Sequence, residues 1–294
     1  MREGDHMIKL VVSDMDGTLI HRSKLSERNL EAIHKLHQNQ IEFAIASGRD
    51  YNGVYSIIHD HDLQCEAILG NGAEYVNQDG ELLISCYMDK SIIKKVIATI
   101  EPFHLPYMIF TNRGFYTGCD PEFVKNQFIE RGIRRFHDSP DDFKPGGRLG
   151  NAPCTKLIKI DDFDTFLNED LEIIKVEVFS LDNTIIPSVK EKLKDISHIS
   201  YLSSFDDNVE ITNEFAQKGL ILKQVAKMKH LKNDEIAVVG DGMNDITMFQ
   251  HFKYSFATNN GEDEIKQLAY QIVADCKDDG FSEAIDTILH MNKI

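Results

Sequence analysis

Short runs of apolar residues alternate with longer amphipathic stretches in the N-terminal part of the chain. The apolar runs lie at 8–12, 42–46 and 66–69, and the stretches between them lie at 26–38 and 51–61. In the first stretch Leu30, Ile33 and Leu36 recur at helical spacing, and Ser26 is a suitable N-cap. Strands that alternate with helices in this way predict a parallel sheet and an α/β fold.

The same alternation returns near the C-terminus. Helices are expected at 218–229, 245–251, 262–269 and 281–290, and strands at 236–239 and 254–257. We therefore expect the two ends of the chain to form one domain, residues 1–85 and 209–294. Residues 1–6 are polar and precede the first strand, so we read them as a terminal extension outside this domain's fold.

The middle of the chain has a mixed pattern of its own. Apolar runs lie at 107–110, 156–160, 173–179 and 200–202, and helical patterns lie at 90–101, 121–131, 163–169 and 187–195. This mixture predicts an open sheet with helices on one face, an α+β domain of residues 86–208 inserted into the first domain.

Composition narrows the classes of partner. The chain has 294 residues, 42% of them hydrophobic, and a formal net charge of −16, which disfavours nucleic-acid surfaces and anionic membranes as partners. Five scattered cysteines without Cys-x-x-Cys spacing are typical of reduced thiols in a cytoplasmic protein. No apolar run approaches the roughly 20 residues that span a bilayer, and no signal-peptide core is expected. Nothing in the composition indicates a protein partner.

Two carboxylates, Asp14 and Asp16, follow the first apolar run and precede Gly17 and Thr18. A strand end gains no stability from two desolvated charges unless a cation or another partner compensates them. The simpler alternative is an exposed turn in which Asp and Gly favour the bend. Three further segments favour the cation site.

These segments place polar groups after other apolar runs or at the beginning of a helix. Ser47 follows the run at 43–46 and can donate a hydrogen bond to a phosphoryl oxygen. Lys218 begins a helical pattern and can neutralise a phosphoryl oxygen. Asp241 and Asp245 follow the run at 236–239, and a helix beginning after Gly242 would let both point into one crevice.

With these motifs the chain resembles the haloacid dehalogenase (HAD) superfamily, and within it the Cof-type phosphatases that carry a large C2-type cap. The four motifs are Asp-Met-Asp-Gly-Thr at 14–18, Ser-Gly-Arg at 47–49, Lys-Gly at 218–219 and Gly-Asp-Gly-Met-Asn-Asp at 240–245. The resemblance extends to Gly-Asn-Gly-Ala at 70–73 and covers nearly the whole chain. It implies a Rossmann-like parallel-sheet core, with the inserted domain as a cap that determines substrate specificity.

The resemblance also implies a role for each acidic residue of the first motif. Asp14 is expected to be the nucleophile that forms an aspartyl-phosphate. Asp16 is expected to protonate the leaving alcohol and then to activate water. The implied cofactor is Mg²⁺, held by Asp14, the backbone carbonyl of Asp16, Asp241 and waters.

The remaining motif residues are expected to support this chemistry. Ser47 and Lys218 would bind the phosphoryl oxygens, with Asn244 and Gly17 as further phosphate contacts. Asp245 would orient Lys218 and a metal-bound water. The segment 257–261 departs from the family pattern, since Asn259 stands where relatives usually have glycine and Gly261 where they have alanine.

The function that this resemblance implies is a Mg²⁺-dependent phosphatase of small phosphorylated metabolites. Sugar phosphates are the first expectation, and FMN, pyridoxal phosphate and the phosphorylated riboflavin precursor are further ones. An aspartate at position 16 favours a phosphatase or mutase over ion pumps, which have threonine there, and over dehalogenases. A phosphomutase or phosphotransferase and a non-catalytic sensor of phosphorylated metabolites remain the alternatives.

Overall fold

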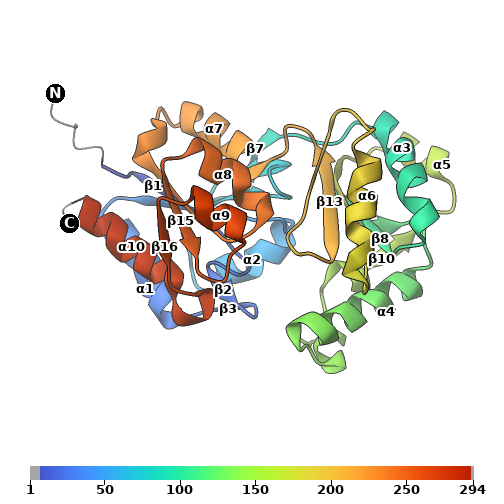
Figure 1. The fold of residues 1–294 in the computed structure, drawn as a ribbon, viewed down its shortest axis with the longest axis horizontal. Helices are drawn as coiled ribbons and strands as arrows, with labels where there is room; N and C mark the ends of the chain where they lie inside the picture. Colours follow the sequence, from blue (N-terminus) through green and yellow to red (C-terminus); the bar gives the residue numbers. More distant parts are fainter. Residues whose placement is uncertain (1–6, 293–294) are drawn as a thin grey trace. The chain divides into compact units, whose positions relative to one another are not determined.

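The chain folds into two compact units in a computed structural model that describes residues 7–292 (Figure 1). We call Met1–Ser85 together with Phe215–Ile294 the core unit, and Cys86–Glu214 the inserted unit. The polar segment 1–6 lies outside the described residues. Within those residues no helix combines the length and the apolar character that crossing a membrane requires.

An eight-stranded sheet forms the centre of the core unit, in the order β16-β15-β14-β1-β4-β5-β6-β7. Its strands are β1 (Leu10–Asp14), β4 (Glu42–Ala46), β5 (Glu66–Leu69), β6 (Glu74–Val76), β7 (Leu82–Ser85), β14 (Ile236–Gly240), β15 (Tyr254–Thr258) and β16 (Gln271–Val273). The strands from β16 to β5 pair in parallel, whereas β6 pairs antiparallel with both β5 and β7. A separate small hairpin joins β2 (Ile20–His21) to β3 (Lys24–Leu25).

Helices precede or follow the parallel strands of the core unit along the chain. They are α1 (Glu27–Gln38), α2 (Tyr51–Asp60), α7 (Lys218–Met228), α8 (Ile246–His251), α9 (Asp263–Leu268) and α10 (Gly280–Met291). The helices α1 and α10 lie side by side (Figure 1) and bury Ile33, Leu36 and Ile285 in one cluster with the strands. The predicted N-cap is present, because Ser26 Oγ accepts a hydrogen bond from Asn29 N at 3.0 Å. The predicted α/β fold is confirmed.

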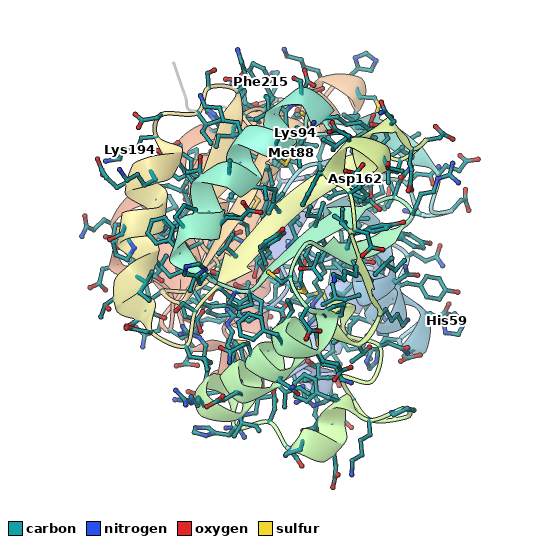
Figure 2. All side chains as sticks on the ribbon, turned by 90° about the vertical axis from the view of Figure 1, so that its right-hand side faces the viewer. His59, Met88, Lys94, Asp162, Lys194 and Phe215 are labelled. Carbon is teal, nitrogen blue, oxygen red and sulfur yellow. The ribbon has the colours of Figure 1, made fainter. Side chains whose placement is uncertain are left out.

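The inserted unit has a six-stranded sheet in the order β10-β9-β8-β11-β13-β12. Its elements are α3 (Lys90–Ile100), β8 (Tyr107–Thr111), β9 (Gly114–Thr117), α4 (Pro121–Arg131), β10 (Leu157–Lys159), α5 (Phe163–Asn168), β11 (Ile173–Phe179), α6 (Ile186–Leu193), β12 (Ile199–Leu202) and β13 (Asn208–Asn213). One face of the sheet packs against α3 and α6 through Val96, Val189 and Val176. Lys94 of α3 lies near Asp162, the N-cap of α5 (Figure 2).

The second boundary between the units differs from the predicted one. We expected the inserted domain to end at 208, but β13 pairs with both β11 and β12 in the six-stranded sheet. The compact unit therefore continues to Glu214. In β13 the buried Glu210 alternates with Val209 and Ile211, and its carboxylate pairs with Lys175 of β11. A buried ion pair of this kind gives the strand the polar pattern of a solvent-facing segment.

Candidate functional site

Three of the predicted site residues lie at the carboxyl ends of adjacent parallel strands. Asp14 is the last residue of β1, Ser47 follows β4 and Asp241 follows β14. The strand β1 lies between β4 and β14, with Asp14 in register with Ala46. Ligands of open α/β sheets bind at such an edge, where the loops that follow the strands converge.

Lys218 joins two of the acidic residues from the first turn of α7. Its side chain is fully buried, and its Nζ donates to Asp14 Oδ1 at 2.5 Å and to Asp245 Oδ1 at 2.6 Å. Burial opposes the charged ammonium, but Asp14 and Asp245 outweigh it and raise the pKa of Lys218. The lysine is therefore a permanent cation at this site.

The position of Lys218 depends on close packing between α7 and α8. Gly219 N donates to Thr247 Oγ1 at 3.0 Å. A Cβ on Gly219 would lie 2.2 Å from the backbone of Thr247, so only glycine permits this approach. Thr247 was not among the predicted site residues, and only the packing of the two helices identifies it.

Asp245 has both carboxylate oxygens occupied by the protein. Its Oδ1 accepts from Lys218, and its Oδ2 accepts from the N–H groups of Asp241 at 2.9 Å and Gly242 at 3.1 Å. The side chain is completely buried. These contacts fix the loop after β14 and orient the lysine, which leaves Asp14 and Asp241 as the carboxylates better placed to bind a cation.

The charges of this cluster do not balance. Ligand oxygens of Asp14, Asp241 and Asp245 all lie within 4.8 Å of one another, and Lys218 is the cation that contacts two of them. Burial raises the pKa of Asp14 well above its usual value, and it raises the pKa of Asp241 to about 7 with help from Asp245. Three carboxylates against one lysine favour a bound cation, and carboxylate oxygens are the ligands that Mg²⁺ and Ca²⁺ prefer.

The side chain of Asp16 does not join this cluster and instead pairs with Arg49. Arg49 Nε donates to Asp16 Oδ2 at 2.7 Å, and its second terminal nitrogen donates to Oδ1 at 2.6 Å. Both side chains are partly exposed, Asp16 by 41% and Arg49 by 30%, so the pair lies at the rim of the site. The sequence showed Arg49 only as the end of the Ser-Gly-Arg motif and indicated no role for it.

Ser47 and Asn244 are linked through Asn71, which the sequence showed only as part of the Gly-Asn-Gly-Ala segment and without a role. Ser47 is buried, and its carbonyl accepts from Asn71 N at 2.9 Å. Asn244 Nδ2 donates to Asn71 Oδ1 at 3.2 Å. Asn71 has a left-handed backbone with φ of 59°, which asparagine tolerates better than most residues. The Gly-Asn-Gly pattern at 70–72 was the available signal of this turn.

Asp241 is also held by residues of the first motif. Thr18 is buried and its Oγ1 donates to Asp241 Oδ1 at 2.7 Å. Gly17 has φ of 87°, and a Cβ there would lie 2.5 Å from Asp241 Oδ2. The glycine and threonine of the first motif therefore shape the contact between the loops after β1 and β14, a function that the sequence motif alone did not reveal.

The unusual segment 259–261, which follows β15, also contacts the loops after β1 and β14. Asn260 Nδ2 donates to Gly17 O at 2.8 Å, and Asn260 Oδ1 accepts from Cys276 N at 2.7 Å. A Cβ on Gly261 would lie 2.9 Å from Asp241 O. In this chain Gly261 gives the loop after β14 the room that it needs.

Known proteins resemble this chain over most of its length. Residues 11–285 match the model of the haloacid dehalogenase-like hydrolase family. Phosphatase YwpJ of Bacillus subtilis is 23% identical over 89% of this chain and 93% of its own length. The 5-amino-6-(5-phospho-D-ribitylamino)uracil phosphatase YwtE of the same organism is 25% identical over 96% of this chain and 98% of its own length. A solved haloacid dehalogenase-like hydrolase from B. subtilis has the same fold, with a TM-score of 0.83, 22% identity, and coverage of 95% of this chain and 99% of that one.

Proposed function

Because the chain belongs to the haloacid dehalogenase-like hydrolases, we propose that it is a Mg²⁺-dependent phosphatase that acts through an aspartyl-phosphate on Asp14. The observation that carries the proposal is the group formed by Asp14, Asp241 and Asp245, in which the buried Lys218 pairs with Asp14 and Asp245. A nucleophilic carboxylate must meet an anionic phosphoryl group there. Lys218 supplies one positive charge at this place, and a divalent cation bound by Asp14 and Asp241 would supply more.

The residues divide the reaction between them. An oxygen of Asp14 attacks phosphorus while the bond from phosphorus to the leaving oxygen breaks, and Asp16 gives that oxygen its proton. Water then attacks the aspartyl-phosphate and gives a proton to Asp16, and the bond between phosphorus and Asp14 breaks to release orthophosphate. We assign to Lys218 and Ser47 the binding of phosphoryl oxygens during both steps. Asn244, whose Nδ2 donates to Asn71 Oδ1, is proposed as a third donor.

The acidic cluster suits a hard divalent cation. Asp14 and Asp241 provide carboxylate oxygens, and the backbone carbonyl of Asp16 is the third proposed ligand. When bound, Mg²⁺ would reduce the repulsion between Asp14 and the phosphate dianion. Asp245 is proposed to position Lys218 and the loop after β14, since both of its oxygens already have donors.

The substrates that we propose are small phosphorylated metabolites, with the inserted unit selecting among them. Two similar proteins of B. subtilis are named as phosphatases, and YwtE is named for a phosphorylated ribitylaminouracil. That name supports a phosphorylated riboflavin precursor as a substrate to test beside sugar phosphates, FMN and pyridoxal phosphate.

The test is phosphate release from these esters and from p-nitrophenyl phosphate, with Mg²⁺ and with EDTA. We expect release with Mg²⁺, loss with EDTA and recovery when Mg²⁺ is restored. An isomeric phosphate ester as the product would instead indicate a mutase. Binding of the esters without any product would indicate a sensor.

A further inference from the structure

Arg49 holds Asp16 by an ion pair of two hydrogen bonds, and the proposed reaction has so far assigned no role to Arg49. The bonds from its Nε and its terminal nitrogen, at 2.7 and 2.6 Å, occupy both oxygens of the Asp16 carboxylate. Such a fork fixes the plane of the carboxylate as well as its position, which a single hydrogen bond or a lysine ammonium would not do.

The guanidinium is itself held in place. Its remaining terminal nitrogen donates to Gly53 O at 3.1 Å in the first turn of α2, and Arg49 N donates to Ser47 Oγ at 3.1 Å. The Arg49 carbonyl accepts from Gly70 N at 2.9 Å, so the backbone is fixed as well. The negative charges of Asp14 and Asp50 also favour the guanidinium at this position.

The backbone of Asp16 is held by a β-bridge to Ile20, whereas its side chain accepts its hydrogen bonds from Arg49. Asp16 lies in the turn after β1, and its side chain is 41% exposed. A carboxylate in that setting would sample several rotamers, and transfer of a proton to a leaving oxygen requires one defined direction. The two bonds from Arg49 to the Asp16 carboxylate supply such a direction.

We propose that Arg49 is a positioning residue that directs the Asp16 carboxylate toward the leaving oxygen of the substrate. This inference rests on the proposed function and deepens it. On arrival of the substrate, one of the two bonds opens and frees one oxygen of Asp16, while the other bond keeps the carboxylate attached to Arg49.

The leaving group provides the test. p-Nitrophenolate departs without a full proton, whereas the alkoxide of a sugar phosphate needs one. We expect Arg49→Gln to lower kcat/KM about 100-fold for the fastest sugar phosphate and less than about tenfold for p-nitrophenyl phosphate. Asp16→Asn should show the same preference, and the double variant should be no worse than Asp16→Asn alone, within about twofold.

Two further variants complete the experiment. Arg49→Lys keeps the charge without the two parallel hydrogen bonds. Its kcat/KM should therefore still fall at least about tenfold more for the sugar phosphate than for p-nitrophenyl phosphate. Lys229→Gln removes a cation that pairs with Glu42 and Glu66 elsewhere in the core unit, and it should leave the ratio between the two esters unchanged. Thermal unfolding of each variant checks that the fold is retained.

Several results would overturn the role of Arg49. One is an equal loss of kcat/KM on both esters in Arg49→Gln, and another is additive losses in the double variant. A third is a parental ratio of kcat/KM between the two esters in Arg49→Lys, which would assign the effect to charge alone. If the parent protein releases no phosphate from either ester, the proposed function fails together with this inference, and that outcome is distinct from the other three.

Discussion

Asp14 lies among groups that affect it in opposite directions. Burial and the carboxylates of Asp241 and Asp245 raise its pKa, whereas Lys218 lowers it. The net effect is a raised pKa, although a nucleophile must be ionised to attack phosphorus. A cation bound between Asp14 and Asp241 would reverse the imbalance, so occupation of the metal site and activation of the nucleophile should be one event.

The first prediction tests Asp14 as the proposed nucleophile. Asp14→Asn keeps the size of the side chain and removes the attacking oxygen, so phosphate release should fall by more than about 1,000-fold. The fold should persist, with a Tm within about 5 °C of the parent. Asp60→Asn, at a residue whose side chain is 68% exposed at the end of α2, is the matched control and should leave turnover unchanged. Near-parental turnover in Asp14→Asn would exclude Asp14 as the nucleophile.

The second prediction concerns Lys218. Lys218→Met leaves Asp14 and Asp245 buried without their cation, which should cost about 3–5 kcal/mol in urea unfolding of the metal-free protein. Mg²⁺ should restore part of this stability but not turnover, because the phosphoryl contact is also lost. The control is Lys227→Gln, an exposed lysine of the same helix. A stability equal to the parent's would show that the buried pairs contribute nothing.

At the scale of elements, the contact between α7 and α8 decides where Lys218 lies. Gly219→Ala would place a Cβ 2.2 Å from the backbone of Thr247, so the helices must separate. We expect a loss of about 1–3 kcal/mol in stability and a lower kcat, because Lys218 moves with its helix. Gln224→Ala on the exposed face of α7 should change neither quantity. An unchanged kcat in Gly219→Ala would separate the packing of α7 from the site.

The elements that the sequence did not predict share a physical cause. The parallel strands β1, β4 and β14 are buried on both faces and read as continuous apolar runs. β7 is largely exposed, β16 has three residues at an edge of the sheet, and β13 contains a buried Glu210 paired with Lys175. In each of these strands the polarity of the side chains reflects local exposure or a single buried ion pair. They lack a repeating apolar pattern, so periodicity does not identify them as strands.

At the scale of the whole molecule, a chain of net charge −16 places an unbalanced group of carboxylates at the edge of its central sheet. Repulsion among them disfavours the metal-free fold whenever they are ionised. A bound divalent cation should therefore contribute to folding stability as well as to turnover.

This gives a prediction for the dependence of stability on pH. The pKa of Asp241 is about 7 in the folded protein and about 3.9 in the unfolded chain, so the folded state binds more protons between these values. The contribution of Asp241 to the stability of the metal-free protein should therefore fall as pH rises from about 4 to about 7 and then level off. Asp14, whose pKa is also raised, acts in the same direction.

Thermal unfolding in EDTA between pH 5 and pH 8 measures this effect. The Tm of Asp241→Asn should depend less on pH than that of the parent, and Mg²⁺ should raise the parental Tm more at pH 8 than at pH 5. Parallel curves for parent and variant would contradict the assignment.

The sequence by itself determined the family and the α/β class, and it predicted that Asp14, Ser47 and Asp241 follow strands of one sheet. These follow from local order: apolar runs become buried parallel strands, and the polar residues just after them must meet at one edge of the sheet. The match to the haloacid dehalogenase-like hydrolases confirms the family. Only the tertiary structure decided which partners each side chain takes. It joins Asp16 to Arg49, Asp245 Oδ1 to Lys218 and Asn260 to Gly17. These contacts connect residues that are 33, 27 and 243 positions apart, so local sequence order does not reveal them.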